Sequence, residues 1–365
     1  MDTNLWVAIQ GNMPSGSVIK TTFGAVNSYT IGVQYMTIES PRLSRRGLLA
    51  AAGATAASLS ALGGAAPALA KAPQSSSERV PFRRVKVGAF EVTTVSDGFA
   101  AVPKVHPIFG QDQSAEAVKS HLEANFLPPD KMQIRFTPVI VNTGNELILF
   151  DTGNGDGRGE TRGHLAKSIE AAGYTPDQID IVVITHYHPD HVGGLMSGGK
   201  ATFPNARYVA GEAEHNFWTS DKIQNSSDKG IQGRLKFVND NVVPLSEKFT
   251  FIKGGNDVVT GITAVEAFGH TPGHMAFNIE SDNTRLVLWA DACNHYVASL
   301  QKPEWHVVFD MDKDAAIASR KEVLGMVAAD KVAATGYHMP FPAIGYVETE
   351  GDAFRWVPHS YQLDM

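Results

Sequence analysis

Five apolar runs that each end in an aspartate or a histidine constrain this 365-residue chain more than any other feature. The runs are LILF, IVVIT, ITAVEAFG, RLVLWA and VAATGY, and they lead in turn to Asp151, His186, His270, Asp291 and His338. Short strands mixed with helical segments predict an α/β layered domain. Because folds of this class build their sites where strand ends gather at one edge of a sheet, we expect these five side chains to lie close together.

Turn signals divide the chain further. Residues 137–153 predict two strands joined at Thr143-Gly144-Asn145, and residues 165–173 predict a helix with a terminal glycine suited to a C-cap. Residues 179–185 predict a buried strand. The segments SSDKGIQG and KGGND, rich in glycine and small polar residues, are expected to be loops.

The segment THYHPDHVGG, which directly follows the strand predicted over 179–185, places His186, His188, Asp190 and His191 within six residues. If His186 leaves the strand and residues 189–191 enter a helix, the first two imidazoles can hold one metal ion. Asp190 and His191 can then face a second ion. Imidazole and carboxylate suit zinc, manganese or iron(II), and no thiolate is required. Solvated surface histidines, the alternative, do not account for such a dense cluster after a buried strand.

The H-x-H-x-D-H spacing resembles the signature of the metallo-β-lactamase superfamily, and the likeness covers roughly residues 85–360. The resemblance implies a four-layer αβ/βα sandwich with the site at the edge between its two sheets. It also implies two divalent metal ions, with zinc as the expected metal. The first ion is then held by His186, His188 and His270, the second by Asp190, His191 and His338, and both by Asp291. Asp151 is expected to orient a ligand histidine through a hydrogen bond, and His274 to lie behind the ligands or in the core.

Two metal ions held in this way imply hydrolysis. A hydroxide shared by the ions is the expected nucleophile, and Asp190 is placed to take a proton and pass it to the leaving group. The expected bond is ester-like, either a phosphotriester or a lactone or carboxylic ester. Hydrolysis of acyl-homoserine lactones as the main activity is the open alternative. A β-lactamase is disfavoured because true β-lactamases typically lack the shared aspartate, and a non-catalytic binding protein because no ligand is missing.

Flanking segments indicate where the substrate binds. NTGNELILFDTG, HPDHVGGLM and FRWVPHSY resemble the methyl parathion hydrolase branch of the superfamily. This resemblance implies a place for Trp218 in an aromatic substrate pocket, although a core aromatic explains Trp218 equally well. Asn294 stands where acyl-homoserine lactonases usually carry a tyrosine. Asn294 and His295 are therefore expected to shape a different leaving-group pocket.

The first seventy residues have the pattern of an export signal. Paired Arg45 and Arg46, an alanine-rich apolar stretch and Ala68-Leu69-Ala70 are typical of a twin-arginine signal peptide over residues 36–70. We therefore expect a periplasmic or secreted protein. Met36 is the expected start, residues 1–35 an extension that is non-native or disordered, and residues 71–365 a single catalytic domain.

Charge and composition narrow the partners to a small-molecule substrate and, as an open option, a second copy of the chain in a homodimer. A net charge of −7 argues against a nucleic-acid-binding face. After residue 70 no apolar run is long enough to predict stable membrane insertion. The single cysteine, Cys293, excludes an intramolecular disulfide and is expected to be a small buried hydrophobe.

Overall fold

The computed structural model describes residues 81–361, and all of them fall within one compact unit, residues 75–365. The predicted extension over 1–35, the predicted signal peptide over 36–70 with Met36, and the first ten residues of the predicted catalytic domain lie outside the described residues. No helix in the described range is both long and apolar enough to cross a membrane.

Two seven-stranded sheets form the centre of this unit, with the strand orders β1-β2-β5-β6-β7-β10-β11 and β12-β13-β14-β15-β16-β17-β18. The strands of the first sheet are β1 (Phe82–Val87), β2 (Phe90–Val95), β5 (Val139–Asn142), β6 (Leu147–Phe150), β7 (Ile181–Ile184), β10 (Arg207–Gly211) and β11 (Phe249–Ile252). Those of the second are β12 (Asp257–Val259), β13 (Ile262–Glu266), β14 (Met275–Ser281), β15 (Thr284–Ala290), β16 (Ala333–Gly336), β17 (Ile344–Glu350) and β18 (Ala353–Pro358). Two small hairpins are made by β3 (Gly98–Val102) with β4 (Met132–Phe136) and by β8 (Met196–Ser197) with β9 (Lys200–Ala201).

Helices occupy the connections between these strands. They are α2 (Ala115–Ala124), α3 (Leu165–Ala171), α4 (Pro189–Val192), α5 (Glu212–Thr219), α6 (Asp221–Gln224), α7 (Lys229–Phe237) and α8 (Lys313–Asp330). Helical segments of the 3-10 type are η1 (Pro176–Gln178) and η3 (Val243–Lys248), and η2 (Val238–Val242) is of the π type.

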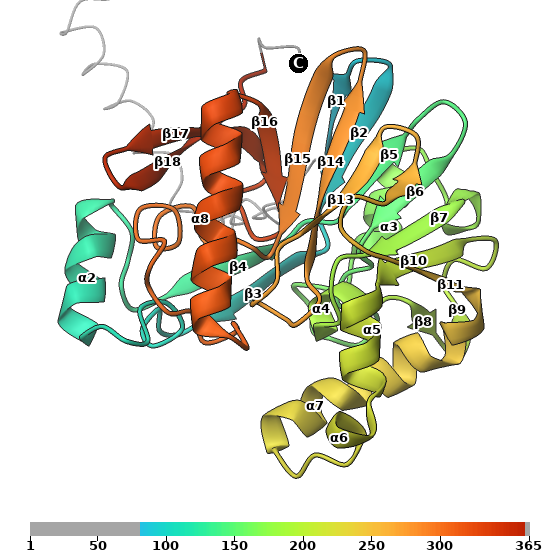
Figure 1. Ribbon diagram of the computed structural model, residues 1–365, viewed down its shortest axis with the longest axis horizontal. Coiled ribbons are helices and arrows are strands. Elements are labelled where there is room, and N and C mark those ends of the chain that lie inside the picture. Colours follow the sequence, from blue (N-terminus) through green and yellow to red (C-terminus); the bar gives the residue numbers. More distant parts are fainter. Residues whose placement is uncertain (1–80, 362–365) are drawn as a thin grey trace, which may run out of the picture. The chain divides into compact units, whose positions relative to one another are not determined.

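The sheets pack face to face, and helices cover their outer faces. In β7, Ile181 and Val183 enter the layer between the sheets, whereas Val182 and Ile184 enter the layer under α3, α5 and α7. This alternation explains why the strand is apolar throughout, since both of its faces are buried. Helix α8 covers the second sheet (Figure 1). Its side chains in the core there include Leu324. The predicted four-layer α/β sandwich is therefore confirmed.

Most predicted elements are present. The predicted pair of strands within 137–153 corresponds to β5 and β6, and the predicted helix within 165–173 to α3, followed by Gly173 at a φ of +90°. The prediction of a loop at SSDKGIQG is wrong, because α7 begins at Lys229. The Asp228 side chain caps this helix by accepting a hydrogen bond from the Ile231 amide at 2.9 Å, and Leu235 anchors it to the core.

The strand ends meet as predicted. Strand β6 is parallel to β7, and β15 is parallel to β16, so their carboxyl ends deliver Asp151, His186, Asp291 and the β16 loop with His338 to the same region. Asp151 and Ala290 adopt φ values of 61° and 47°. Backbone in this left-handed region is costly for residues other than glycine and concentrates at functional sites.

Candidate metal centre

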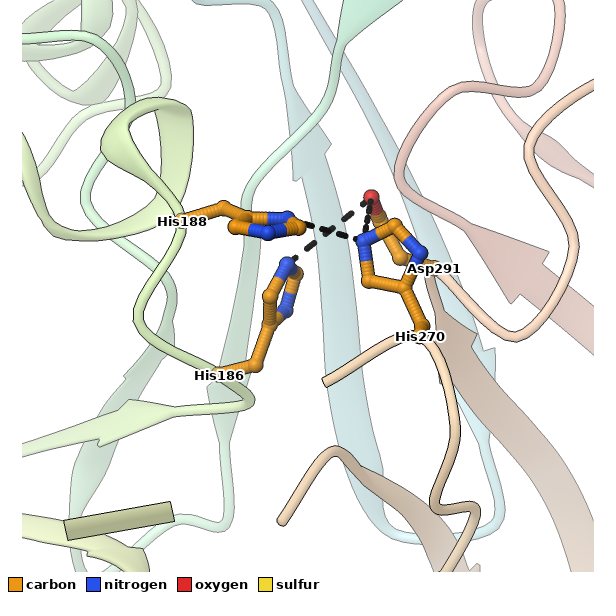
Figure 2. A group of neighbouring side chains, drawn as sticks. All are labelled: His186, His188, His270 and Asp291. Carbon is orange, nitrogen blue, oxygen red and sulfur yellow. Dashed lines mark hydrogen bonds and ion pairs between the residues drawn. The ribbon is translucent and has the colours of Figure 1, made fainter. Parts of the chain in front are cut away.

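The structure brings together all seven side chains predicted as metal ligands. They form two groups, within each of which the candidate ligand atoms lie within 4.8 Å of one another: His186, His188, His270 and Asp291 in the first, and Asp190, His191 and His338 in the second. The predicted helix after His188 is present as α4 and carries Asp190 and His191. Figure 2 shows the first group, in which His186 and His188 point from one side and His270 and Asp291 from the other toward a common centre.

Asp291 lies between the two groups. Its Oδ2 atom is 3.2 Å from Nε2 of His270 and 3.0 Å from Nε2 of His338, and its Oδ1 atom is 3.4 Å from Nε2 of His191. The His186 imidazole is slightly more distant, with its Nε2 atom 3.9 Å from Oδ2 (Figure 2). One carboxylate therefore contacts members of both groups, which is the arrangement predicted for a shared ligand.

Several atoms of the cluster have no hydrogen-bond partner among the described residues, although they are buried. These atoms are Nε2 of His186, His188 and His191 and Oδ1 of Asp291. Buried polar atoms are rarely left unpaired, so such a concentration calls for a ligand that accepts lone pairs. Divalent cations satisfy nitrogen and oxygen lone pairs together, and the donor set suits zinc, manganese or iron(II). The residues present therefore fit two divalent metal ions.

Hydrogen bonds from behind orient the imidazoles of the first sheet. His191 donates from Nδ1 to Oδ2 of Asp151 at 2.8 Å, so the predicted hydrogen bond from a cluster histidine to Asp151 is present. The Thr185 hydroxyl also donates to Oδ2 of Asp151, at 2.9 Å, and accepts from Nδ1 of His186 at 3.1 Å. Because Nδ1 is engaged in both rings, their Nε2 atoms are the ones free to face the centre.

The second sheet holds its histidines in the same way. His338 donates from Nδ1 to the Arg135 carbonyl oxygen at 2.6 Å. His274 donates from Nδ1 to the Ala267 carbonyl oxygen and accepts the Asp291 amide at Nε2, at 3.0 Å in each case. Burial lowers the pKa of His274 to about 3, which keeps its Nε2 atom an acceptor. His274 therefore lies behind Asp291 and positions it, as predicted.

The sequence does not predict the role of Asp310 in positioning a candidate ligand, because no motif surrounds it. Its Oδ1 atom accepts from Nδ1 of His270 at 2.8 Å, and its Oδ2 atom accepts from the buried guanidinium of Arg320 at 2.7 Å. Arg320 lies on the inward face of α8. An arginine among the apolar positions of a helix was the available signal, because a buried cation needs an anionic partner.

Glu214 was also missed, although it is fully buried beside the cluster. Its Oε1 atom accepts from the Tyr187 amide and from Nε1 of Trp218, both at 2.8 Å. Its Oε2 atom accepts from the Thr271 hydroxyl at 2.6 Å and from the Gly273 amide at 2.9 Å. One carboxylate thus ties the loop between His186 and His188 to the loop that carries His270.

The three residues predicted to contact substrate do not line the cavity beside the cluster. Trp218 is fully buried in the core and donates to Glu214, so the structure favours the core alternative over a place in the substrate pocket. His295 is also buried outside the lining of this cavity, and its Nδ1 atom accepts from the amides of Val297 and Ala298. Asn294 lies behind the cluster, where its side-chain amide donates to Oδ2 of Asp291 at 3.0 Å.

Burial and neighbouring charges shift the pKa values of the cluster residues. Burial lowers the pKa of His270, but Asp291 and Asp310 more than compensate and raise it to about 9. Burial raises the pKa of Asp291, whereas His338 and His191 hold it well below its usual range. For His186, burial and its neighbours His191 and His188 lower the pKa well below the usual value. The imidazole of His186 therefore stays neutral and available as an electron-pair donor.

A cavity of about 360 Å³ opens beside His188, Asp190 and His338. The apolar part of its lining, which we call the apolar wall, consists of Ala100, Val102, Ile134 and Phe136 of the β3–β4 hairpin together with Phe309. The basic part, called the arginine wall, consists of Arg158, Arg162 and Arg234. The cavity is thus large enough for a small organic molecule, and its lining combines apolar and positively charged side chains.

Comparisons with known proteins agree with this geometry. Residues 137–332 match the family described as the metallo-beta-lactamase superfamily. AidC, a dizinc quorum-quenching lactonase solved with the product N-hexanoyl-L-homoserine, is 29% identical, with a TM-score of 0.70 over 77% of this chain and 98% of that one. Hydrolase AbOPH, described as a member of the beta lactamase superfamily, is 24% identical, with a TM-score of 0.72 over 79% of this chain and 100% of that one, and supports the fold.

A curated relative is more distant. The N-acyl homoserine lactonase of Bacillus cereus is 23% identical over 163 residues, which are 45% of this chain and 57% of the relative. The chain therefore spans little more than half the length of that relative. Since the family match covers more than half of the chain and the fold agrees, the chain belongs to the metallo-beta-lactamase superfamily.

Proposed function

We propose that the chain hydrolyses lactones and related carboxylic esters at a centre of two divalent metal ions. The observation that carries the proposal is the arrangement of seven nitrogen and oxygen donors in two groups around Asp291, with unpartnered atoms in both groups. In support, AidC is named as a dizinc lactonase and matches this chain over 98% of its own length. Hydrolysis of acyl-homoserine lactones as the main activity is the second candidate, which the names of the lactonase relatives favour.

The side chains divide the work between holding the centre and moving a proton. When bound, two divalent ions would lower the pKa of water and polarise the carbonyl under attack. Asp151, Thr185 and Asp310 fix the imidazoles from behind, so the donors need no rearrangement during the reaction. Asp190 is the more accessible of the two carboxylates in the cluster, with 24% of its side chain exposed against 3% for Asp291. We therefore assign Asp190 the transfer of a proton to the leaving oxygen.

The apolar wall supports a substrate with a hydrocarbon part next to the scissile bond. Ile134, Phe136 and Phe309 offer a surface for an acyl or aryl group beside the cluster. The burial of apolar surface contributes roughly 25 cal/mol per Å² to binding. The hydrocarbon part would orient the carbonyl toward the metal groups.

A substrate panel tests the proposal. The purified protein, loaded with zinc or manganese, is offered acyl-homoserine lactones, aryl lactones, aryl esters, a dimethyl aryl phosphotriester and nitrocefin. We expect the lactones and esters to be cleaved fastest. Turnover of nitrocefin alone, or of the phosphotriester alone, would reject the proposed bond.

The Asp291→Ala variant tests the metal centre directly. We expect two metal ions per chain in the unmodified protein and one or fewer in this variant, with most activity lost, because the variant removes the carboxylate shared by both groups. Asp352→Ala, at an exposed turn between β17 and β18, is the matched control and should keep both ions. An Asp291→Ala protein with two ions and full turnover would refute the bridging role.

A further inference from the structure

Three arginines form one wall of the cavity beside the metal centre. Arg158 and Arg162 lie in the connection between β6 and α3, and Arg234 lies on α7. The same cavity is lined by His188, Asp190 and other members of the cluster. The positive wall therefore faces the place where the substrate would react.

The protein provides few partners for the positive charges and N–H donors of these guanidinium groups. Among residues 81–361, no carboxylate forms an ion pair with Arg158, Arg162 or Arg234, and no oxygen accepts a hydrogen bond from the side chains of Arg158 or Arg234. The Nε atom of Arg158 is buried without a partner. Arg162 donates from Nε to the Arg158 carbonyl oxygen at 2.9 Å, which fixes the position of its side chain.

The nearest acids have other contacts. Asp190 is the one acid that attracts both Arg158 and Arg234, and it belongs to the metal cluster. Asp228 also attracts Arg234, but its Oδ1 atom caps α7. Burial is the main influence on the pKa of Arg158 and of Arg234 and lowers both. Partial burial of two cations without paired anions is costly unless a ligand supplies the negative charge.

A purely structural role explains only part of this wall. The Arg158 guanidinium lies over the Phe237 ring, with Cζ 4.5 Å from its centre. Such stacking holds the plane of the guanidinium but uses none of its N–H groups. The donors of Arg158 are therefore positioned and still available to a planar or tetrahedral oxyanion.

We infer that the substrate carries an anionic group, of the carboxylate or phosphate type, bound by Arg158, Arg162 and Arg234 while its ester bond lies at the metal centre. This inference rests on the proposed function, which supplies the ester or lactone bond. The apolar wall binds the hydrocarbon part and the arginine wall binds the charged end. The cavity thus selects an acidic ester over a neutral one of the same length.

A matched pair of esters tests the inference. The 4-nitrophenyl ester of glutaric acid has a free carboxylate, and the corresponding ester of monomethyl glutarate lacks it. We expect the metal-loaded enzyme to favour the acid over its methyl ester by at least about tenfold in kcat/KM, the ratio that one charge-assisted hydrogen bond provides. The preference should fall about tenfold in Arg234→Gln and in Arg158→Gln, and less in Arg234→Lys, which keeps the charge but not the fork.

The control variant is Arg355→Gln, on strand β18, where the exposed Arg355 side chain pairs with Glu348. It should leave the activity on both esters, and so the preference, unchanged. Equal turnover of the two esters by the unmodified enzyme would overturn the inference. So would arginine variants that lose the same factor on both esters, because that result assigns the arginines to the fold alone.

Binding of uncleaved analogues separates this inference from the proposed function. The 4-nitroanilides of glutaric acid, of monomethyl glutarate and of 4-phosphonobutanoic acid are titrated calorimetrically into the same proteins. Tighter binding of either acidic anilide than of the neutral one, weakened in Arg234→Gln, supports the inference even if neither ester is cleaved. Whichever acidic anilide binds more tightly shows whether the site prefers a carboxylate or a phosphate-type group. Equal affinity for acidic and neutral anilides would reject it even if both esters are cleaved.

Discussion

Replacement of Glu214 should disturb the metal centre although Glu214 contacts no candidate ligand atom. Its carboxylate accepts four hydrogen bonds from groups that include the amides of Tyr187 and Gly273 and the indole of Trp218. In Glu214→Gln the amide oxygen can serve Tyr187 and Trp218, and the Thr271 hydroxyl can turn to accept from the new NH₂ group. The Gly273 amide then faces a donor, and one buried unsatisfied donor costs about 1–3 kcal/mol.

Glu214→Ala removes both acceptor oxygens and so all four hydrogen bonds, and it leaves a cavity. We therefore expect a loss of about 3–5 kcal/mol in the free energy of unfolding. Urea unfolding followed by tryptophan fluorescence and by far-UV circular dichroism measures both losses. Affinity for zinc, measured by competition with a chelator, should fall in Glu214→Gln and fall further in Glu214→Ala. Both variants weaken the hold on Tyr187, which lies between the candidate ligands His186 and His188.

Trp218→Phe is the matched control because it keeps a buried aromatic ring while it removes the Nε1–H donor together with part of the indole. We expect it to cost about 1 kcal/mol and to leave KM unchanged, since Trp218 does not line the cavity. The reasoning fails if both Glu214 variants stay within about 0.5 kcal/mol of the unmodified protein, the range of ordinary surface substitutions. A raised KM in Trp218→Phe would instead return Trp218 to the substrate pocket.

Three further perturbations test the metal centre and the burial of the residues around it. Asp310→Asn should lower zinc affinity about 10–100-fold, measured by chelator competition, because the carboxylate that orients His270 is lost while its volume is kept. Removal of metal by a chelator should abolish hydrolysis and lower the melting temperature, and added zinc or manganese should restore both, because the ions bind only the folded chain; an unchanged melting temperature would contradict this. Cys293 is buried as predicted, and burial raises its pKa to about 12. At pH 8 its thiolate fraction is then about one in ten thousand, so we expect no alkylation by iodoacetamide, followed by mass spectrometry, until the protein is unfolded; rapid labelling of the folded protein would show an accessible thiol.

The sequence predicts those parts of the fold and of the metal centre that depend on residues close together in the chain. Strand β7 is apolar over both faces because it is buried between two layers, and the ligand-rich segment follows it within a few residues. His270, Asp291 and His338 were predicted from their positions after apolar runs and from the superfamily resemblance. A strand end fixes the place of the next residue, so these positions follow from the order of elements alone.

The parts that sequence did not predict depend on pairs of residues far apart in the chain. Asp310 meets His270 only because α8 packs on the second sheet and carries Arg320 to the same point. Neither residue stands in a motif. Trp218 was ambiguous because its apolar ring and its donor suit a pocket and a core equally. Glu214, four residues earlier on α5, was the local signal that the indole N–H could be satisfied internally.

The division of the candidate ligands between the two sheets explains why so many buried polar groups surround the centre. The first sheet and α4 supply His186, His188, Asp190 and His191, whereas the loops and strand ends of the second supply the remaining three. Apolar packing between the sheets is non-directional and cannot by itself fix the relative position of donors to within a few tenths of an ångström. Glu214 joins the two sets of loops through directional hydrogen bonds, and the His274 side chain holds the Asp291 amide. The polar network therefore supplies the precision that metal binding needs, at a cost in burial that the large apolar layers offset.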